Sequence, residues 1–457
     1  MLLSHIPLRA SVKTSTTKCL IIAAGLGSRL AARGDSKPLV ALLGLPLIER
    51  VILTARKAGL DDFYVVTGHK GEEVRDFLDS LSTRRDLRIS YIENEEWESA
   101  GNGLSVLKAK GHLDEPFVLT MVDHLFDEQI LNGLLRTSLK KDEICLAVDE
   151  KLENPLVDLD DVTKVRVHDG HIAEIAKEIE DYNAFVTGLF LCTPAIFAGL
   201  EESMSKDNDS SLSGGIRILA QQQKVKTFNI GDSFWIDVDD ESAFERAERH
   251  LLGHLRKNSD GPVSRYIERP VSVRMTRHLV KATNISPNLI SFFSFICCAV
   301  AALLFARPGY LPLALGALLA QFASILDGCD GEIARLKFME SDFGGWFDAV
   351  LDRYADAFLL LGLLWHVYMP NPSSLVLMVG FLAIIGSFMN SYTADKYDGI
   401  MKTKFEKGRE IRIGRDVRIA LISVGAILNI PLLVLFLVAI LMNAETVRRI
   451  FVAYRHA

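Results

Sequence analysis

Four aspartates lie in a C-terminal half that is otherwise strongly apolar. Asp327 and Asp330 are spaced i, i+3, and Asp348 and Asp352 are spaced i, i+4, so each pair shares one face of a helix. The short segment between the pairs lets the two faces meet. Converging carboxylates repel one another unless a cation lies between them, and all-oxygen ligands select Mg²⁺, with Mn²⁺ or Ca²⁺ as alternatives. Simple helix-end charges are a weaker interpretation, because charges are rare inside membranes.

A second set of reactive groups lies near the N-terminus. A short apolar strand, 18–24, runs into a glycine-rich turn with Gly25 and Gly27, and the cations Arg29 and Lys37 follow. Such a turn between strand and helix presents backbone N–H groups to phosphates. The turn alone is a weak signal, but two adjacent cations are what a leaving pyrophosphate needs.

The composition indicates two kinds of protein in one chain. The sequence has 457 residues, of which 49% are hydrophobic and 24% charged, with a net charge of -7. Its mean hydropathy of +0.21 is too high for a wholly soluble enzyme, whereas the charged fraction is too high for an entirely membrane-embedded chain. The mild acidity gives no reason to expect a nucleic-acid partner. The scattered cysteines show neither zinc nor disulfide spacing, which favours a reducing cytosol for the soluble part.

Residues 1–251 show strands alternating with helices. Apolar strands are predicted at 63–66 and 117–122, and helices at 71–81 and 103–110. This alternation predicts a Rossmann-like α/β domain, with a parallel or mostly parallel sheet covered on both faces. The continuous apolar character of the strands agrees with burial of both faces.

Residues 252–457 predict a membrane domain. The polar stretch 252–263 contains turn formers and is interpreted as a linker. Basic and apolar residues mix in 264–281, which predicts an amphipathic helix on the membrane surface; a solvated connecting helix is the alternative. Long uncharged stretches follow, and the breakers within two of them divide 282–457 into six spans, an all-α transmembrane domain.

The loop charges orient these spans. Six Lys and Arg residues lie between the fourth and fifth spans, at 396–412, and Arg335 and Lys337 lie between the second and third. The opposite loops carry only Arg307. The positive-inside rule then places both termini and the N-terminal domain in the cytoplasm, with the chain a multi-pass protein of the cell membrane.

The string Asp327-Gly-Cys-Asp330-Gly331-Glu-Ile-Ala-Arg335, followed by Gly344-x₃-Asp348-x₃-Asp352, resembles the CDP-alcohol phosphotransferase signature at every fixed position. The resemblance covers 284–455 and implies that a CDP-linked alcohol donates its phosphoalcohol group to a hydroxyl, releasing CMP. It implies metal binding by the first three aspartates, and a general-base role with a further metal contact for Asp352. Gly331 and Gly344 would leave room for nucleotide and Arg335 would contact the donor phosphate. A homodimer through the membrane helices is also implied.

The acceptor of this transfer is less clear from the sequence. Four arginines precede or open the fifth span, and they are interpreted either as ligands of an anionic acceptor or as an ordinary positive-inside loop. The two interpretations are equally favoured. The residues are Arg409, Arg412, Arg415 and Arg418.

The first half, over 17–251, resembles the nucleotidyltransferases that join an NTP to a sugar or polyol phosphate, through the motif A-A-G-x-G-x-R…K-P. The resemblance implies catalytic roles for Arg29 and Lys37 and metal binding by Asp123, with either Asp237 or Asp239 as second ligand. Lys177 would bind the acceptor phosphate, although a surface lysine is the more ordinary interpretation. His124, after Asp123, is interpreted as an ordinary strand-end residue. The implied nucleotide-binding residues are Ala24, Gly25, Gly27, Ser28, Thr67, Gly68, Asn102 and Ser105.

Together the two halves would make and then consume a CDP-activated alcohol. This pairing resembles the bifunctional enzymes of di-myo-inositol phosphate synthesis, which implies CTP and inositol 1-phosphate as first substrates and CDP-inositol as the intermediate. CDP-inositol would then react with a second inositol 1-phosphate. One alternative is a lipid acceptor in the second step. Another is a transporter or membrane scaffold, which is disfavoured because the spans lack an inverted repeat.

Overall fold

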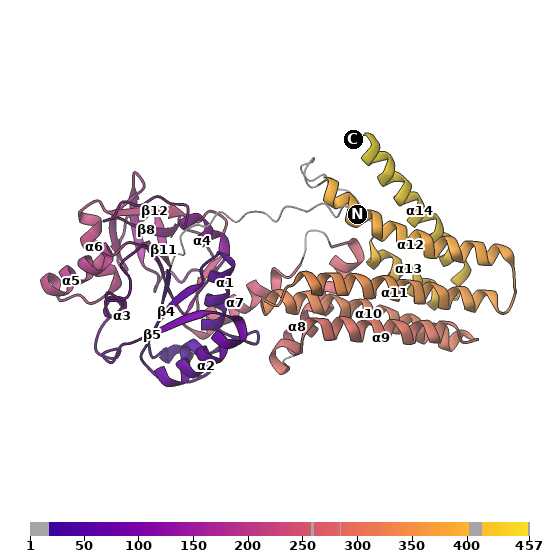
Figure 1. Ribbon diagram of the computed structural model, residues 1–457, viewed down its shortest axis with the longest axis horizontal. Coiled ribbons are helices and arrows are strands. Elements are labelled where there is room, and N and C mark those ends of the chain that lie inside the picture. Colours follow the sequence, from indigo (N-terminus) through magenta and orange to yellow (C-terminus); the bar gives the residue numbers. More distant parts are fainter. Residues whose placement is uncertain (1–17, 257–259, 284, 402–413, 456–457) are drawn as a thin grey trace, which may run out of the picture. The chain divides into compact units, whose positions relative to one another are not determined.

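A computed structural model describes residues 18–256, 260–283, 285–401 and 414–455 of the chain (Figure 1). The chain divides into two compact units, and the boundary in the sequence lies between His250 and Leu251. The first unit is an α/β fold and the second is helical.

A nine-stranded sheet forms the centre of the first unit, in the order β5-β4-β1-β6-β11-β8-β12-β10-β9. Its first four strands are parallel, as expected. From β6 onward, by contrast, antiparallel pairings predominate, with β8–β12 parallel. The strands are β1 (Lys18–Ala23), β4 (Asp62–Thr67), β5 (Arg88–Glu93), β6 (Phe117–Met121), β8 (Ile144–Asp149), β9 (Lys164–His168), β10 (His171–Ala176), β11 (Ala184–Cys192) and β12 (Val225–Asn229).

Both faces of this sheet are covered. Leu20 and Ile22 of β1 join a core with α3, α5 and α6, while Cys19 and Ile21, which alternate to the opposite face, are also fully buried. The two small pairs β2–β3 (Ala41–Leu42, Leu45–Pro46) and β7–β13 (His124–Phe126, Trp235–Asp237) lie outside the large sheet. The helices are α1 (Leu47–Lys57), α2 (Gly71–Arg85), α3 (Asn102–Leu107), α4 (Glu128–Leu134), α5 (Ala195–Asp207), α6 (Leu212–Gln221) and α7 (Glu241–Gly253).

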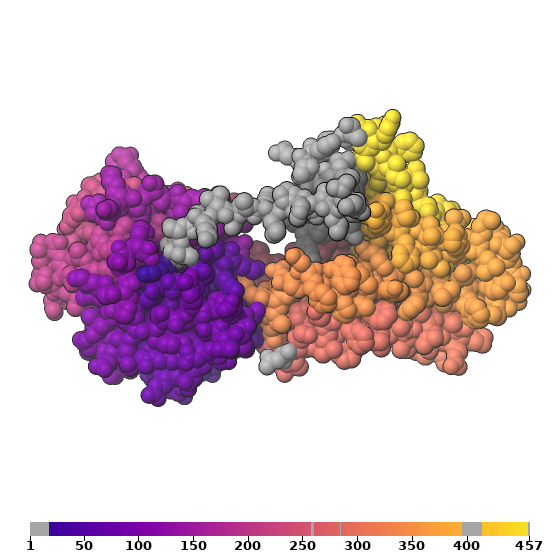
Figure 2. All heavy atoms as spheres, viewed as in Figure 1, coloured from indigo at the N-terminus to yellow at the C-terminus, as the bar shows by residue number. Residues whose placement is uncertain are grey.

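The second unit is built from long helices that pack side by side (Figure 1). In the space-filling view, the salmon and orange segments of its earlier helices lie directly against each other (Figure 2). α9 contacts both α10 and α11, and at Gly362 the backbone of α11 comes so close to Ala302 that an added Cβ would lie 2.4 Å from its carbonyl oxygen. The described helices after the junction are α9 (Pro287–Phe305), α10 (Tyr310–Leu336), α11 (Asp342–Tyr368), α12 (Ser374–Met401), α13 (Arg415–Ile427) and α14 (Pro431–Arg455).

Four of these helices, α9, α10, α12 and α14, are long and apolar enough to cross a membrane. The predicted breakers, 369–374 and 429–431, do separate helices, since α11 ends at Tyr368 before α12 begins at Ser374, and α13 ends at Ile427 before α14 begins at Pro431. However, the expected count of six spans is not confirmed. α13 has only 13 residues, and α11 carries three aspartates and Arg353 along its first half. The described helices identify a membrane protein, with four candidate spans.

The segment 264–281 is helical, as expected, in a short π-helical turn η3 (Ser264–Glu268) and α8 (Arg269–Ala282). Tyr266, Ile267 and Val271 are exposed. The buried face is polar and packs against α10, with Arg269, Ser272 and Thr276 inward. The helix is therefore present, and its exposed side carries basic residues, among them Arg274 and Lys281, beside these apolar side chains.

Candidate active sites

The first candidate site lies at the carboxyl ends of β1, β4 and β6, the edge at which open α/β sheets bind ligands. The glycine-rich turn after β1 leads into a short 3₁₀ helix, Ser28–Leu30, and Lys37 begins another. Gly27 has φ +65°, and a Cβ there would lie 2.4 Å from the Cβ of Lys37. Glycine at this position therefore lets the lysine approach the turn.

Lys37 and Asp123 form the centre of this site. The Lys37 ammonium lies 2.5 Å from Asp123 Oδ2, and both side chains are largely buried. Burial opposes the charged form of each group, but Asp123 and Asp237 raise the pKa of Lys37. Lys37 and His124 together lower the pKa of Asp123 despite its burial. Both groups are therefore held in their charged forms.

Strand pairing brings Asp237 to the same place. β13 runs antiparallel to β7, with Asp237 opposite His124. His124 Nδ1 lies 2.7 Å from Asp123 Oδ1, and its Nε2 lies 3.9 Å from Asp237 Oδ2. Asp123, His124 and Asp237 thus offer ligand atoms within 4.8 Å of one another. The sequence interpreted His124 as an ordinary strand-end residue, whereas in the structure it is buried between two carboxylates.

Asp239, the other candidate, belongs to a separate ion-pair chain. Arg29 donates to Asp161 at 2.6 Å and lies 2.8 Å from Asp239. Asp161 also pairs with Lys177. Burial, a hydrogen bond with Asp161 and the charge of Asp237 raise the pKa of Asp239 to about 7. Asp161, in the loop between β8 and β9, was missed from the sequence because no spacing ties that acidic loop to the distant cations.

The segments implied to frame the nucleotide base lie around the same edge. Thr67 ends β4, and at Gly68 a Cβ would lie 2.7 Å from the Ala24 carbonyl oxygen. Asn102 Oδ1 accepts from Leu212 N–H at 2.9 Å. The Ser105 hydroxyl accepts from Asn94 at 2.9 Å. The side chains of Asn102 and Ser105 thus hold α3 to neighbouring segments.

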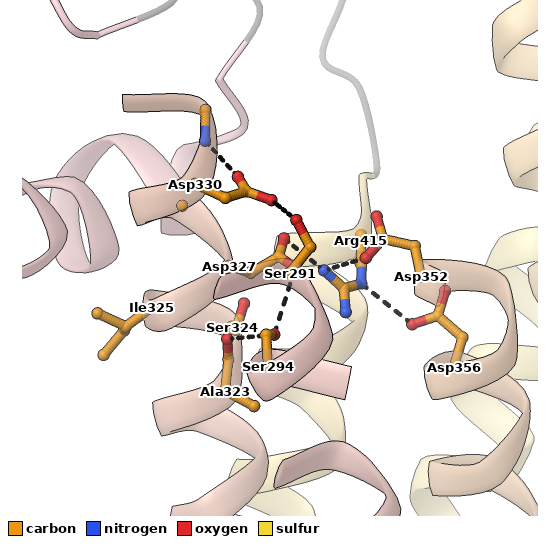
Figure 3. Close-up of polar contacts among 12 residues, drawn as sticks. Ser291, Ser294, Ala323, Ser324, Ile325, Asp327, Asp330, Asp352, Asp356 and Arg415 are labelled. Atoms are coloured by element: carbon orange, nitrogen blue, oxygen red, sulfur yellow. Dashed lines mark hydrogen bonds and ion pairs between the residues drawn. The ribbon is translucent and has the colours of Figure 1, made fainter. Parts of the chain in front are cut away.

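The second candidate site lies between α9, α10 and α11. Asp327, Asp330 and Asp348 offer ligand atoms within 4.8 Å of one another, as the two-faced pattern predicted. Ser291 of α9 donates to Asp330, and Ser294 donates to Asp327 at 3.3 Å (Figure 3). Neither serine was singled out from the sequence, because a serine on an apolar helix carries no spacing signal of its own.

Arg415 connects this cluster to the fourth aspartate (Figure 3). Its Nη1 lies 2.7 Å from both Asp327 Oδ2 and Asp352 Oδ1, and its Nε lies 3.4 Å from Asp356 Oδ1. Asp356 also pairs with Arg418, and the last two side chains are almost completely buried. The structure thus brings Arg415 to Asp352, the general-base candidate, while the Arg418 side chain is buried between the helices.

The remaining signature residues are placed as follows. Gly344 N–H donates to the Ser341 hydroxyl at the start of α11, and a Cβ on Gly344 would lie 3.2 Å from Asn288 Oδ1. Arg335 donates to the Leu255 carbonyl at 3.0 Å. The Gly331 N–H donates to the Asp330 carboxylate. Arg409 and Arg412 lie outside the described residues.

Both carboxylate clusters have the donor chemistry of a divalent-cation site. Asp237 Oδ1 in the first cluster and Asp348 Oδ1 in the second are buried and have no hydrogen-bond partner among the described residues. Leaving a buried carboxylate oxygen unpaired is costly, and a cation would remove that cost. The residues present therefore fit a divalent metal ion at each site.

The buried Arg418–Asp356 pair gives a stability prediction. Replacing Arg418 leaves the buried Asp356 carboxylate with only its longer contact to Arg415, so Arg418→Met should lower the free energy of unfolding by about 3 kcal/mol. The double variant Arg418→Met/Asp356→Asn should recover part of this loss, because no charge is left unpaired. Melting temperatures in detergent measure both effects, with the exposed Arg274→Met as control. An unchanged melting temperature for Arg418→Met would contradict the assignment of the pair.

Family models match parts of both units. The MobA-like NTP transferase domain family matches residues 19–177, and the CDP-alcohol phosphatidyltransferase family matches 284–455. The chain is 35% identical to "Bifunctional IPC transferase and DIPP synthase" of Rubrobacter xylanophilus, over 95% of this chain and 96% of that protein. It is 33% identical to the protein of the same name from Archaeoglobus fulgidus, over 90% of this chain and 78% of that protein.

Among solved structures, the inositol-1-phosphate CTP transferase from T. maritima is 25% identical and superposes with a TM-score of 0.47, covering 52% of this chain and 95% of that one. The two relatives named above match nearly the whole chain, through both units. The chain carries a nucleotidyltransferase domain and a CDP-alcohol phosphotransferase domain. It belongs to the family of bifunctional IPC transferases and DIPP synthases.

Proposed function

We propose that the chain catalyses two consecutive reactions. The first unit joins CTP and inositol 1-phosphate to give CDP-inositol and pyrophosphate. The second unit transfers phosphoinositol from CDP-inositol to a second inositol 1-phosphate and releases CMP. The observation that carries this proposal is the presence of two carboxylate clusters, one beside a phosphate-binding turn and one in the CDP-alcohol signature. They lie on a chain that is similar over 95% of its length to a bifunctional relative.

In the first step a phosphate oxygen of inositol 1-phosphate attacks the α-phosphorus of CTP, and the bond to pyrophosphate breaks. The backbone of the turn at Gly25 and Gly27 binds the phosphates. Lys37 and Arg29 stabilise the charge that develops on the leaving pyrophosphate. Lys177 binds the acceptor phosphate. Its pairing with Asp161, which also pairs with Arg29, supports an acceptor phosphate position near the triphosphate.

In the second step a hydroxyl of the acceptor attacks the phosphorus that carries the inositol of the donor, and CMP leaves. Asp352 accepts the proton of that hydroxyl. Arg415, 2.7 Å from Asp352, binds the phosphate of the acceptor and so orients its hydroxyl toward this carboxylate. Gly331 and Gly344 leave room for the nucleotide, and Arg335 contacts the donor phosphate. Arg409, Arg412 and Arg418 remain predicted acceptor ligands, and the buried position of Arg418 favours an indirect role.

Divalent ions, Mg²⁺ first, would neutralise the phosphate charge in both steps. Asp123 and Asp237 would hold the ion of the first site, and the proximity of Asp237 to His124 favours it over Asp239, which pairs with Arg29. Asp327, Asp330 and Asp348 would hold the ions of the second, with a contact from Asp352.

The chain is proposed to lie in the cell membrane with both termini and the N-terminal domain cytoplasmic, because Lys and Arg are concentrated in the loops on one side. A homodimer through the transmembrane helices is proposed from the family resemblance. The lipid bilayer is then the remaining partner, and the exposed apolar side chains of α9, α12 and α14 support contact with it.

The proposal is tested by following pyrophosphate and CMP separately. Purified protein in detergent is incubated with Mg²⁺, each of the four common NTPs, and a panel of phosphorylated polyols. Pyrophosphate should appear with CTP and inositol 1-phosphate, and CMP should follow. EDTA should abolish both products, and added Mg²⁺ should restore them. If another phosphoalcohol gives both products and inositol 1-phosphate gives neither, the substrate assignment is wrong. CMP release with a lipid acceptor alone would overturn the acceptor assignment.

A further inference from the structure

The first described residues of the second unit, 251–256 and 260–282, form a junction segment that contacts the signature helix α10. Glu332, inside the signature, is fully buried and is not one of its fixed positions. Its carboxylate accepts from Arg269 Nη1 at 2.7 Å, from the Ser272 hydroxyl at 2.6 Å and from Thr276 at 2.7 Å. All three donors lie on α8, which precedes the residues matched by the CDP-alcohol family.

Arg269 extends this network in both directions. It donates to the Gly328 carbonyl at 3.2 Å, next to Asp327. Toward the N-terminus it forms a bidentate pair with Asp260, at 2.9 and 3.0 Å. A two-pronged, buried guanidinium–carboxylate pair fixes both partners in position. Asp260, which the sequence placed in the linker, is therefore bound to Arg269 within the second unit.

Two further contacts tie the junction to functional side chains. Arg335, the predicted donor-phosphate contact, donates to the Leu255 carbonyl. Asp416, the neighbour of Arg415, accepts from the backbone N–H groups of Val263 and Ser264, both at 3.1 Å. The junction thus contacts the segments that carry two of the predicted substrate-binding arginines.

The two sides of α10 make different contacts. Residues 327 and 330 project toward α9 and α11, where the carboxylates converge, whereas Gly328 and Glu332 lie one turn apart on the side that α8 covers. Partners that hold a ligand-bearing segment from behind set the orientation of its metal ligands, and losing them commonly costs 10- to 100-fold in metal affinity or activity.

We propose that Glu332 and Arg269 are positioning residues of the phosphotransferase step, through which the junction holds the signature helix and its metal-binding aspartates in register. This inference rests on the proposed second reaction. It extends that site beyond the six helices into the connecting segment, and it assigns function to Glu332, Arg269 and Asp260, which lie outside the fixed positions of the signature.

The test uses the full-length protein with CDP-inositol and inositol 1-phosphate, and follows CMP at increasing Mg²⁺. Glu332→Gln keeps the shape of the side chain but removes its charge, so the half-saturating Mg²⁺ concentration should rise about tenfold. Arg269→Lys keeps the positive charge but loses the bidentate contact of the guanidinium, and it should also raise the half-saturating Mg²⁺ concentration. Glu340→Gln and Arg274→Lys are matched exposed controls. Pyrophosphate release by the first unit should be unchanged in all four.

The outcomes separate this inference from the proposed function. If the wild-type protein releases no CMP from CDP-inositol, the proposed second reaction fails. If the wild type is active and both variants keep its Mg²⁺ dependence, the positioning role is wrong. A lower melting temperature with wild-type Mg²⁺ dependence would also overturn it, because that is the result of a purely structural role. If Glu332→Gln does not fold, Arg269→Lys and Asp260→Asn decide by the same measurement.

Discussion

Asp352→Asn should stop CMP release while pyrophosphate release continues at the wild-type rate. Asparagine cannot accept the proton of the acceptor hydroxyl, and loss of a general base typically lowers a rate by about a thousandfold. The variant also removes a charge 2.7 Å from Arg415, but the Arg415 guanidinium keeps Asp327 and Asp356 as partners. CDP-inositol should therefore accumulate when the variant is given CTP and inositol 1-phosphate.

The same chain provides the control for this experiment, because the two products report on different units. Asp342→Asn, an exposed aspartate in the first turn of α11, is the matched substitution and should leave both rates unchanged. A substantial rate of CMP release by Asp352→Asn would exclude Asp352 as the general base. Loss of pyrophosphate release as well would show that the substitution acts on the whole protein.

Lys37→Ala should have the opposite effect. The ammonium lies 2.5 Å from Asp123 Oδ2 in a largely buried pair, beside the phosphate-binding turn. Its loss removes a cation that stabilises the leaving pyrophosphate, which costs about a hundred- to a thousandfold in rate. Pyrophosphate release from CTP and inositol 1-phosphate is the measurement. When CDP-inositol is supplied, CMP release should proceed as in the wild type.

Lys110→Ala is a suitable comparison, because this exposed lysine pairs with Glu201 on the surface. Wild-type pyrophosphate release by Lys37→Ala would remove Lys37 from the mechanism. If Lys37→Ala and Asp352→Asn are mixed, CDP-inositol made by one protein should be used by the other. Product formation in the mixture would then show that the intermediate exchanges through solution.

The chemistry of both sites was readable in the sequence because it depends on local spacing. Asp327 and Asp330 share one face of their helix wherever that helix packs in the fold, and the same is true of Asp348 and Asp352. The strand followed by a glycine turn and two cations is equally local. Hydropathy separates the two halves for the same reason, since each stretch carries its own composition.

Other features depend on pairings between distant segments. Asp237 meets Asp123 because β13 pairs with β7 in a register that no local pattern encodes. The antiparallel part of the sheet was missed because β11, which pairs antiparallel with both β6 and β8, is as buried and as continuously apolar as a parallel strand. The six-span prediction counted uncharged stretches, and the charged first half of α11 and the short α13 reduced the supported spans to four.

By itself, then, the sequence indicated two transferase domains, their order on the chain and most carboxylates of the two candidate sites, since covalent spacing carries that information. Tertiary structure decided which neighbours hold those carboxylates. Arg415 bridges Asp327 and Asp352 from a separate helix, and Glu332 is bound by α8 through side chains distant in sequence. A buried charge must find its partners in space, and packing of the helices alone brings them together.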